Sequence, residues 1–400
     1  NQGGLINSPG RLLLDNLSSV DNRAGEISSA YSFDLRGERL DNRNGKVLSD
    51  RTLALVSTLG LDNRQGRLAG AQLLMLAGSL DNSNGHLTAQ DGATLTVGAT
   101  LDNRSGEILA RDITLNIGAL ENLAGIVQAD NLLQINAGGL GNHYGILASR
   151  QNLALNAAHL DNTHGQLSAN ATLTAAITGN LLNANGVVSA GSNLQLSSAN
   201  LFSSSGQVSA GDSLQLRTGH FDNSNAGRVH ARDLNLNVSV LDQLGGGRLQ
   251  SQGNLSLDLN HGVLINYGGL INAPGQLSLN NLTRVDNRQG EISSNQAFLF
   301  NATELDNRSG KLLSAQLLTL RIAQALDNGA GLLSALRLDA HAGSLGNVAG
   351  KLNASHDLNL TVESALDNSS GEILALVAIL RAASLSNQQG RCLLYTSPSP

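Results

Sequence analysis

Apolar and polar residues alternate in two short patches within each stretch of about twenty residues along this chain. Alternation with a period of two is typical of β-strands that turn one face towards a core. Each stretch therefore predicts two or three short strands. In residues 101–119 the predicted inward positions are Ile108, Ala110, Ile113, Leu115 and Ile117. The same places are filled elsewhere by Val47, Leu53, Leu55, Leu87, Leu95, Val97, Ile292, Phe298 and Phe300.

A tetrad of the form Asn-x-x-Gly, usually preceded by Leu-Asp, separates these stretches. Its closing glycines recur at intervals of 19–22 residues from Gly25 to Gly390. A unit of this size cannot bury a core alone, so the units must stack into one array. We expect the tetrad to turn the chain and to form a ladder between coils. The residues assigned to these structural roles are Asn22, Gly25, Asn42, Gly45, Asn63, Gly66, Asn82, Gly85, Asn103 and Gly106.

The repeat predicts an all-β fold, a right-handed parallel β-helix solenoid of about twenty coils over residues 1–390. Each strand would pair with its copy one coil later, at about 4.8 Å. A leucine-rich repeat is the alternative with a similar period, but it is expected to carry one strand per unit and regular prolines. A helical repeat conflicts with the frequency of glycine, which destabilises helices.

Two properties of the tetrad explain why it recurs. Asparagine and glycine tolerate left-handed backbone angles, so we expect both to supply the corners. Identical amides stacked along one axis can also hydrogen-bond to one another. The sequences LLNANG and LFSSSG, between residues 181 and 206, lack the usual aspartate, and the second also lacks the asparagine. The ladder should therefore be interrupted there.

A longer period lies above the short one. Residues 1–10 match residues 266–275, and the register then holds, so that block 1–125 corresponds to block 266–390. Pro9 and Pro274 are then one structural position seen twice. Residues 391–400 should match a strand but carry two prolines, so we expect a non-repeat, foreign tail there. Because residue 1 lies within a repeat, we expect the segment to be internal to a longer chain.

Composition narrows the function further. Aromatic residues make up 2% of the chain, which suits a narrow core filled by aliphatic side chains. The net charge is −6, and the basic residues are scattered singly, which is no footprint for nucleic acid. No apolar run is long enough for a transmembrane segment. Cys392 is the only cysteine, so no disulfide frames the fold.

The candidate chemical groups favour a structural interpretation. The aspartates before the tetrads suggest a calcium column, but arginines two positions later can offset their repulsion, and the calcium β-roll pattern is absent. Glu26 and Glu107 recur as Glu291 and Glu372, as block duplication predicts for solvated strand positions. The histidines are scattered, and the glycine-rich segments 139–145 and 244–248 do not open a helix, which argues against phosphate binding. We expect no catalytic residue, no metal and no cofactor.

The repeated pattern L-D-N-x-x-G-x-[ILV]-x-[AS], followed by L-x-L, resembles the haemagglutinin repeats of filamentous haemagglutinin-type exoproteins. That group includes two-partner secretion adhesins and the stalks of contact-dependent growth-inhibition toxins. The resemblance implies a right-handed β-helical filament on the bacterial surface or secreted from it, exported through an outer-membrane transporter. It also implies that adhesive or toxin domains lie elsewhere in the chain.

The sequence therefore predicts a non-catalytic stalk that presents an adhesive or toxin domain to a receptor or glycan on a target cell. Two alternatives stay open. One is a carbohydrate-active or carbohydrate-binding β-helix, although coils of such constant length leave no long loop to frame an active site. The other is an autotransporter passenger.

Overall fold

The computed structural model describes residues 1–394 and confirms the predicted fold class, a parallel β-solenoid of about 19 turns with a period of about 20 residues. Described residues contain strands, turns and bends but no helix, so none has the length and apolar character of a membrane-spanning helix. The chain divides into two compact units, Asn1–Ala199 and Asn200–Pro400. The border between them lies outside both copies of the duplicated block.

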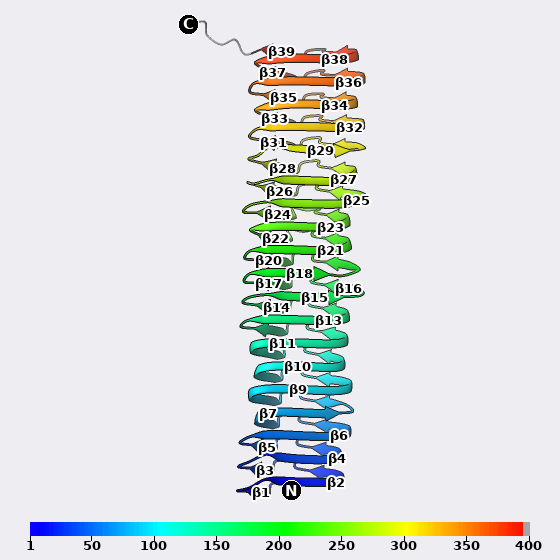
Figure 1. Ribbon diagram of the computed structural model, residues 1–400. Helices are drawn as coiled ribbons and strands as arrows, with labels where there is room; N and C mark the ends of the chain where they lie inside the picture. Colours follow the sequence, from blue (N-terminus) through cyan, green and yellow to red (C-terminus); the bar gives the residue numbers. More distant parts are fainter. Residues whose placement is uncertain (395–400) are drawn as a thin grey trace. The chain divides into compact units, whose positions relative to one another are not determined.

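Within the first unit, one to three strands make up each coil (Figure 1). The sequence predicted two or three, but in the three coils between Gly85 and Gly145 a single continuous strand takes their place. The strands are β1 (Leu5–Ser8), β2 (Leu12–Asp21), β3 (Glu26–Ser29), β4 (Phe33–Asp41), β5 (Lys46–Ser49), β6 (Thr52–Asp62), β7 (Arg67–Ala77), β8 (Leu80–Asp81), β9 (His86–Asp102), β10 (Glu107–Glu121), β11 (Ile126–Gly141), β12 (Ile146–Ser149), β13 (Asn152–Asp161), β14 (Gln166–Ala169), β15 (Leu173–Ile177), β16 (Asn180–Leu182), β17 (Val187–Ala190) and β18 (Asn193–Ser197).

The second unit is built in the same way. Its strands are β19 (Asn200–Phe202), β20 (Gln207–Ala210), β21 (Ser213–Asp222), β22 (Arg228–Ala231), β23 (Asp233–Asp242), β24 (Arg248–Ser251), β25 (Leu255–Ile265), β26 (Leu270–Ala273), β27 (Leu277–Asp286), β28 (Glu291–Ser294), β29 (Phe298–Ala302), β30 (Glu304–Asp306), β31 (Lys311–Ser314), β32 (Leu317–Asp327), β33 (Leu332–Ala335), β34 (Arg337–Gly346), β35 (Lys351–Ala354), β36 (Asp357–Asp367), β37 (Glu372–Ala375), β38 (Val377–Ser386) and β39 (Arg391–Leu394).

Within each unit, strands pair in parallel with their counterparts in the next coil. Strand β3 pairs with β5, for example, so that Ile27 lies opposite Val47, and β5 pairs with β7, so that Val47 lies opposite Leu68. This register places like residues above like residues and joins the apolar positions of successive coils into one core. Every position of the repeat therefore becomes a column that runs from coil to coil.

The core of each unit consists mainly of leucine, isoleucine, valine and alanine. All the inward positions predicted from the alternation are buried, with Ile108 and Leu115 at 0% exposure. Phenylalanine enters the core at only a few places, among them Phe33 and Phe300, which are fully buried. The period-two pattern thus identified the inner face correctly, because a strand alternates its side chains between two faces.

The predicted end of the array needs a correction. Strand β39 pairs in parallel with β37, with Arg391 opposite Glu372 and Cys392 opposite Ile373. The repeat pairing therefore continues through residues 391–394, which the sequence analysis assigned to a foreign tail. The prolines that motivated that assignment are Pro398 and Pro400, and they come after this strand. Residues 395–400 lie outside the described residues.

Candidate functional site

The tetrad forms a tight turn at one corner of each coil. In the first complete tetrad the Gly25 N–H donates to the Asn22 carbonyl at 3.0 Å. The left-handed residue is Ala24, with φ of 52°, whereas neither Asn22 nor Gly25 has a positive φ. The asparagine and glycine that frame the tetrad therefore do not supply the left-handed angles, although the third residue that does is itself an asparagine at Asn44 and Asn84. The third residue supplies them, where a type II turn usually favours glycine.

The glycine is required for a different reason, which is close approach between coils. A Cβ atom on Gly45 would lie 2.2 Å from the carbonyl oxygen of Asn22 in the preceding coil. On Gly66 it would lie 2.3 Å from the carbonyl oxygen of Asn42. Backbone cannot yield as a flexible side chain can, so only glycine fits at this position while the coils keep their spacing.

The asparagine side chains form a buried column in the first unit. The Asn22 Nδ2 donates to Asn42 Oδ1 at 2.7 Å, and the Asn42 Nδ2 donates to Asn63 Oδ1 at 2.7 Å. The same step continues through Asn82 and Asn103, at 2.7 Å each. These side chains are 0% exposed. Each Nδ2 also donates to the carbonyl of the tetrad glycine, so the column ties every corner to the next one.

The second unit contains the same column but with a defect near its start. Position 203 is a buried serine, and the Oδ1 atom of Asn223 in the next coil is buried without a hydrogen-bond partner. The next column residue is Gln243, which accepts from Asn223 at 3.2 Å and donates to Asn266 at 2.9 Å. The sequence predicted an interruption at LFSSSG, which lacks the asparagine of the tetrad. The interruption also predicted at LLNANG does not occur, because Asn183 is buried and accepts from the column amide of the preceding coil at 2.8 Å.

A charged column runs beside the asparagines on the outer surface. Arg23 binds Asp21 of its own coil at 2.6 Å and lies 3.7 Å from Asp41 of the next. Arg43 repeats the pattern, at 2.7 Å from Asp41 and 3.6 Å from Asp62. Hydrogen bonds from Arg23 lower the pKa of Asp21, and those from Arg43 lower the pKa of Asp41. The arginines therefore neutralise the stacked carboxylates both within a coil and between coils.

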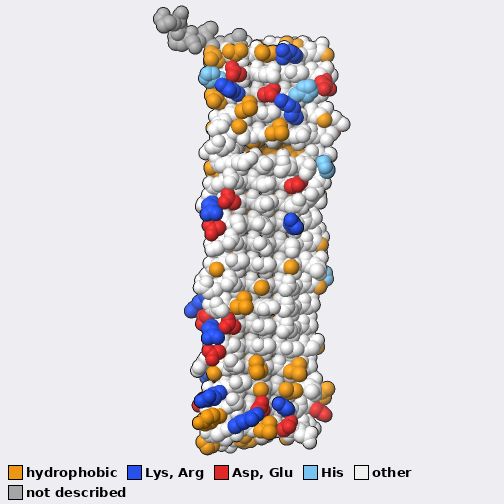
Figure 2. Space-filling model, in the orientation of Figure 1, with side chains coloured by type: hydrophobic (Ala, Val, Ile, Leu, Met, Phe, Trp, Pro, Cys, Tyr) orange, Lys and Arg blue, Asp and Glu red, His pale blue; other side chains and the backbone are white. Residues whose placement is uncertain are grey.

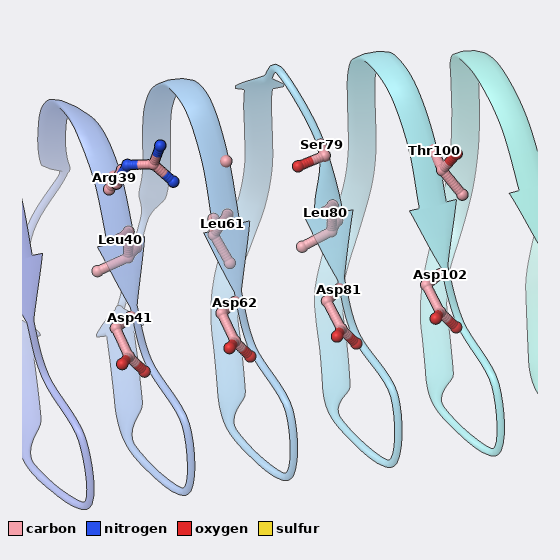
Figure 3. A pocket seen from close by; sticks show the side chains of 11 residues that line it. Arg39, Leu40, Asp41, Leu61, Asp62, Ser79, Leu80, Asp81, Thr100 and Asp102 are labelled. Atoms are coloured by element: carbon pink, nitrogen blue, oxygen red, sulfur yellow. The ribbon is translucent and has the colours of Figure 1, made fainter.

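A shallow groove of about 450 Å³ follows this column across four coils of the first unit. Figure 3 shows Asp41, Asp62, Asp81 and Asp102 projecting to the same side, one from each coil, with leucines beside them. Three of the four aspartates bind the arginine two positions later; Asp81 instead accepts from the Ser83 hydroxyl at 2.6 Å. Desolvation raises the pKa of Asp102, but hydrogen bonds from Arg104 outweigh it and leave that pKa lowered. These carboxylates are held as paired anions.

The remaining surface carries its charges in mixed order. The face in Figure 2 shows acidic and basic side chains lying beside one another. Among residues 1–394, no group of three or more histidine, cysteine, aspartate or glutamate side chains is arranged to hold a metal ion. What the corners can do chemically is to bind one coil to the next.

One cluster of aromatic and histidine rings was not predicted from the sequence, because the histidines were interpreted as scattered surface residues. The rings of His143, Tyr144 and His164 lie together on the corners of two neighbouring coils. The signal was present in the repeat register, because Tyr144 and His164 both occupy the third position of consecutive tetrads. Aligning the tetrads by position rather than by residue type would have brought them together.

Comparison with known proteins places this architecture in a family. No curated protein and no solved structure matches the chain. The family model described as haemagglutinin repeat matches residues 1–122, 108–181, 164–301, 281–370 and 333–397. These overlapping matches include every tetrad whose amide, glycine and aspartate stack as described above. The chain therefore belongs to the haemagglutinin repeat family.

Proposed function

We propose that this segment is the non-catalytic stalk of a large secreted or cell-surface bacterial exoprotein. In this role it presents an adhesive or toxin domain, located elsewhere in the protein, to a target cell. The haemagglutinin repeat family is a structural and adhesin family, and its β-solenoid fold supports an adhesin-like stalk. Export through an outer-membrane two-partner secretion transporter, and a receptor or glycan on the target cell, belong to the same proposal.

The observation that carries the proposal is how the repeated polar groups are used. The asparagine amides hydrogen-bond to the next coil, and the aspartates before them bind arginines of their own and neighbouring coils. The residues that recur most regularly thus hold the coils together. A general acid or base would instead need a carboxylate free to exchange its proton with a substrate.

Removing a single coil provides a test. Deleting residues 63–81 joins Asp62 to Asn82 and keeps the order of every column, but it removes Asp81 and with it one of the four coils that line the groove. If the segment is a spacer, the exoprotein that carries it should still be exported and the presented domain should keep its activity. Deleting residues 63–72 removes half a coil together with the tetrad corner at 63–66, so the following strands lose their register with the neighbouring coils, which should abolish surface display.

Two results would contradict the proposal. One is loss of the presented domain's activity in the 63–81 deletion while surface display, measured with an antibody to a terminal tag, stays normal. The other is release of reducing ends or unsaturated uronates from a polysaccharide by the purified chain, abolished by Asp81→Asn. Asp212→Asn is a suitable control, since Asp212 lies outside the groove and pairs with Arg232.

A further inference from the structure

We propose that Tyr144, flanked by His143 and His164, forms a stacking platform that binds the ring of a hexopyranose on the outer surface of the first unit. This proposal goes beyond the stalk function, because it places a binding site on the stalk itself. Its failure would leave the stalk proposal intact.

The first observation is an unusual pair of residues at a strained position. The third residue of every tetrad in the first unit has a left-handed backbone, and elsewhere it is small or carries an amide, as at Ala24, Ser105 and Asn185. Tyr144 and His164 adopt φ of 53° and 56° in consecutive coils. Bulky residues rarely take this conformation, and such outliers concentrate at functional sites.

The second observation is the packing of the three rings. The rings of Tyr144 and His164 are stacked, with centroids 4.7 Å apart and an angle of 27° between their planes. His143 meets Tyr144 edge to face, with centroids 4.4 Å apart. The two imidazoles therefore fix the orientation of the phenol ring, while Tyr144 remains 57% exposed. An aromatic ring that is both exposed and held in place is suited to receive a ligand, because little conformational freedom is lost on binding.

The third observation concerns the neighbours of Tyr144 in the adjacent coils. The His164 ring stacks on Tyr144 from the following coil, whereas the equivalent position in the preceding coil is Ala124, whose side chain is only a methyl group. The neighbouring residue of that preceding tetrad, Leu123, is 42% exposed.

The other tyrosines in the described part of the chain are used differently. The Arg51 guanidinium lies 5.2 Å from the centre of the Tyr31 ring, and the Arg288 guanidinium lies 5.3 Å from that of Tyr267. These contacts are cation–π interactions within the protein. Within residues 1–394 no arginine or lysine lies over Tyr144 in a contact of this kind, and its side chain is 57% exposed.

The combination of groups indicates the class of ligand. A pyranose ring presents C–H groups on one face and hydroxyls around its edge. The C–H face fits the electron-rich face of an aromatic ring, while the imidazoles of His143 and His164 beside that ring can exchange hydrogen bonds with the hydroxyls. A purely apolar partner would leave these polar groups without a role. A shallow site with one stacked ring predicts weak binding, which adhesion would strengthen through several copies.

The test uses the full 400-residue chain and ligand-observed saturation-transfer NMR. The probes are the methyl glycosides of glucose, galactose and mannose, each at millimolar concentration. At least one should receive saturation, strongest at the protons of its C–H face. Tyr144→Ala should lower the affinity about tenfold or more, in line with the loss of one stacking interaction. Tyr144→Phe should retain binding, since it keeps the ring.

The chain supplies good controls for folding and specificity. Ala124 occupies the same left-handed position as Tyr144, so Tyr144→Ala should leave the melting temperature unchanged. Tyr31→Ala removes an exposed aromatic ring at a different place and should leave sugar binding unchanged. The proposal is overturned if no glycoside receives saturation, if Tyr144→Ala binds as well as the unaltered chain, or if Tyr31→Ala reduces binding equally.

Discussion

Residues 40–106 of the first unit and residues 203–247 of the second unit differ in the regularity of their corners and of the amide column that joins them. In the first region every corner spans four residues, and the amide-to-amide distances in the column stay at 2.7 Å. In the second region, two successive corners contain five residues, with left-handed pairs at Asn225 and Ala226 and at Gly245 and Gly246. The column there contains one unsatisfied amide oxygen and a longer contact of 3.2 Å.

The comparison shows what the tetrad contributes. Parallel strand pairing and a buried aliphatic core continue through residues 203–247 although the corner changes. The core and the ladder hydrogen bonds thus determine the fold, and the tetrad adds a local increment of stability at each coil. In a stacked array such increments add between nearest neighbours, so an irregular coil is a local weak point.

The largest effect is expected from adding a methyl group inside a regular corner. Gly66→Ala would place its Cβ 2.3 Å from the Asn42 carbonyl oxygen and 2.5 Å from the Asn63 amide oxygen. The coils would have to separate, which should destabilise the surrounding coils by roughly 4 kcal/mol or more. Gly98→Ala is the control, since its nearest neighbour would lie at 3.7 Å.

Hydrogen exchange followed by mass spectrometry would measure this difference coil by coil. It suits a long array better than one melting temperature, because repeat arrays need not unfold in a single step. Protection of residues 40–90 should fall in Gly66→Ala and stay unchanged in Gly98→Ala. Equal protection in both variants would contradict the argument from close approach.

The next effect concerns the amide column itself. Asn63→Ala removes one acceptor of the Asn42 amide, which keeps its bonds to two backbone carbonyls, and it removes the donor to the buried Oδ1 atom of Asn82. The cost should be about 2–3 kcal/mol, from one buried unsatisfied acceptor and one lost hydrogen bond. Asn223→Ala should cost clearly less, because that side chain already has an unsatisfied oxygen and a longer bond to Gln243.

Local unfolding free energies from hydrogen exchange would rank the two variants. If Asn223→Ala destabilised its coils as much as Asn63→Ala does, the column would not be the source of the difference between the two regions.

A repair of the defect should have a smaller effect and the opposite sign. Ser203→Asn would place an Nδ2 donor next to the unsatisfied Oδ1 of Asn223, as in every regular coil. Satisfying one buried acceptor should stabilise the neighbouring coils by about 1 kcal/mol. Slower exchange of the backbone amides of residues 220–230 would report it, with Ser203→Ala as a variant that cannot supply the donor. Faster exchange in Ser203→Asn would show that the wider corner excludes the amide.

The sequence was sufficient to predict the fold and to name the asparagines and glycines that lie in the columns, because each structural position occurs many times in a repeat sequence. Three details were not predicted from it. The left-handed residue is the variable third one, whose side chain gives no compositional signal, as Ala24 and Gln65 show. The five-residue corners kept the overall period and were hidden by it. The cluster around Tyr144 depends on contact between coils, which follows from the register and not from any local motif.

The smallest effect separates the charged column from the amide column. The pKa of Asp41 lies below its ordinary value because of its hydrogen bonds to Arg43, so this carboxylate contributes stability above the unfolded pKa of about 3.9. That contribution is lost as the pH falls through the folded pKa. Arg43→Gln should therefore destabilise the first unit slightly at pH 6, as expected for an exposed ion pair, and by almost nothing once Asp41 is protonated. Arg67→Gln, which removes an arginine without a salt bridge in the described residues, should show no such pH dependence.

In residues 222–242 the aspartates before the corners are followed two positions later by Ser224 and Leu244, so acid should remove less protection from hydrogen exchange there. Equal loss of protection in both regions between pH 6 and pH 2 would assign acid sensitivity to groups other than the aspartate–arginine column.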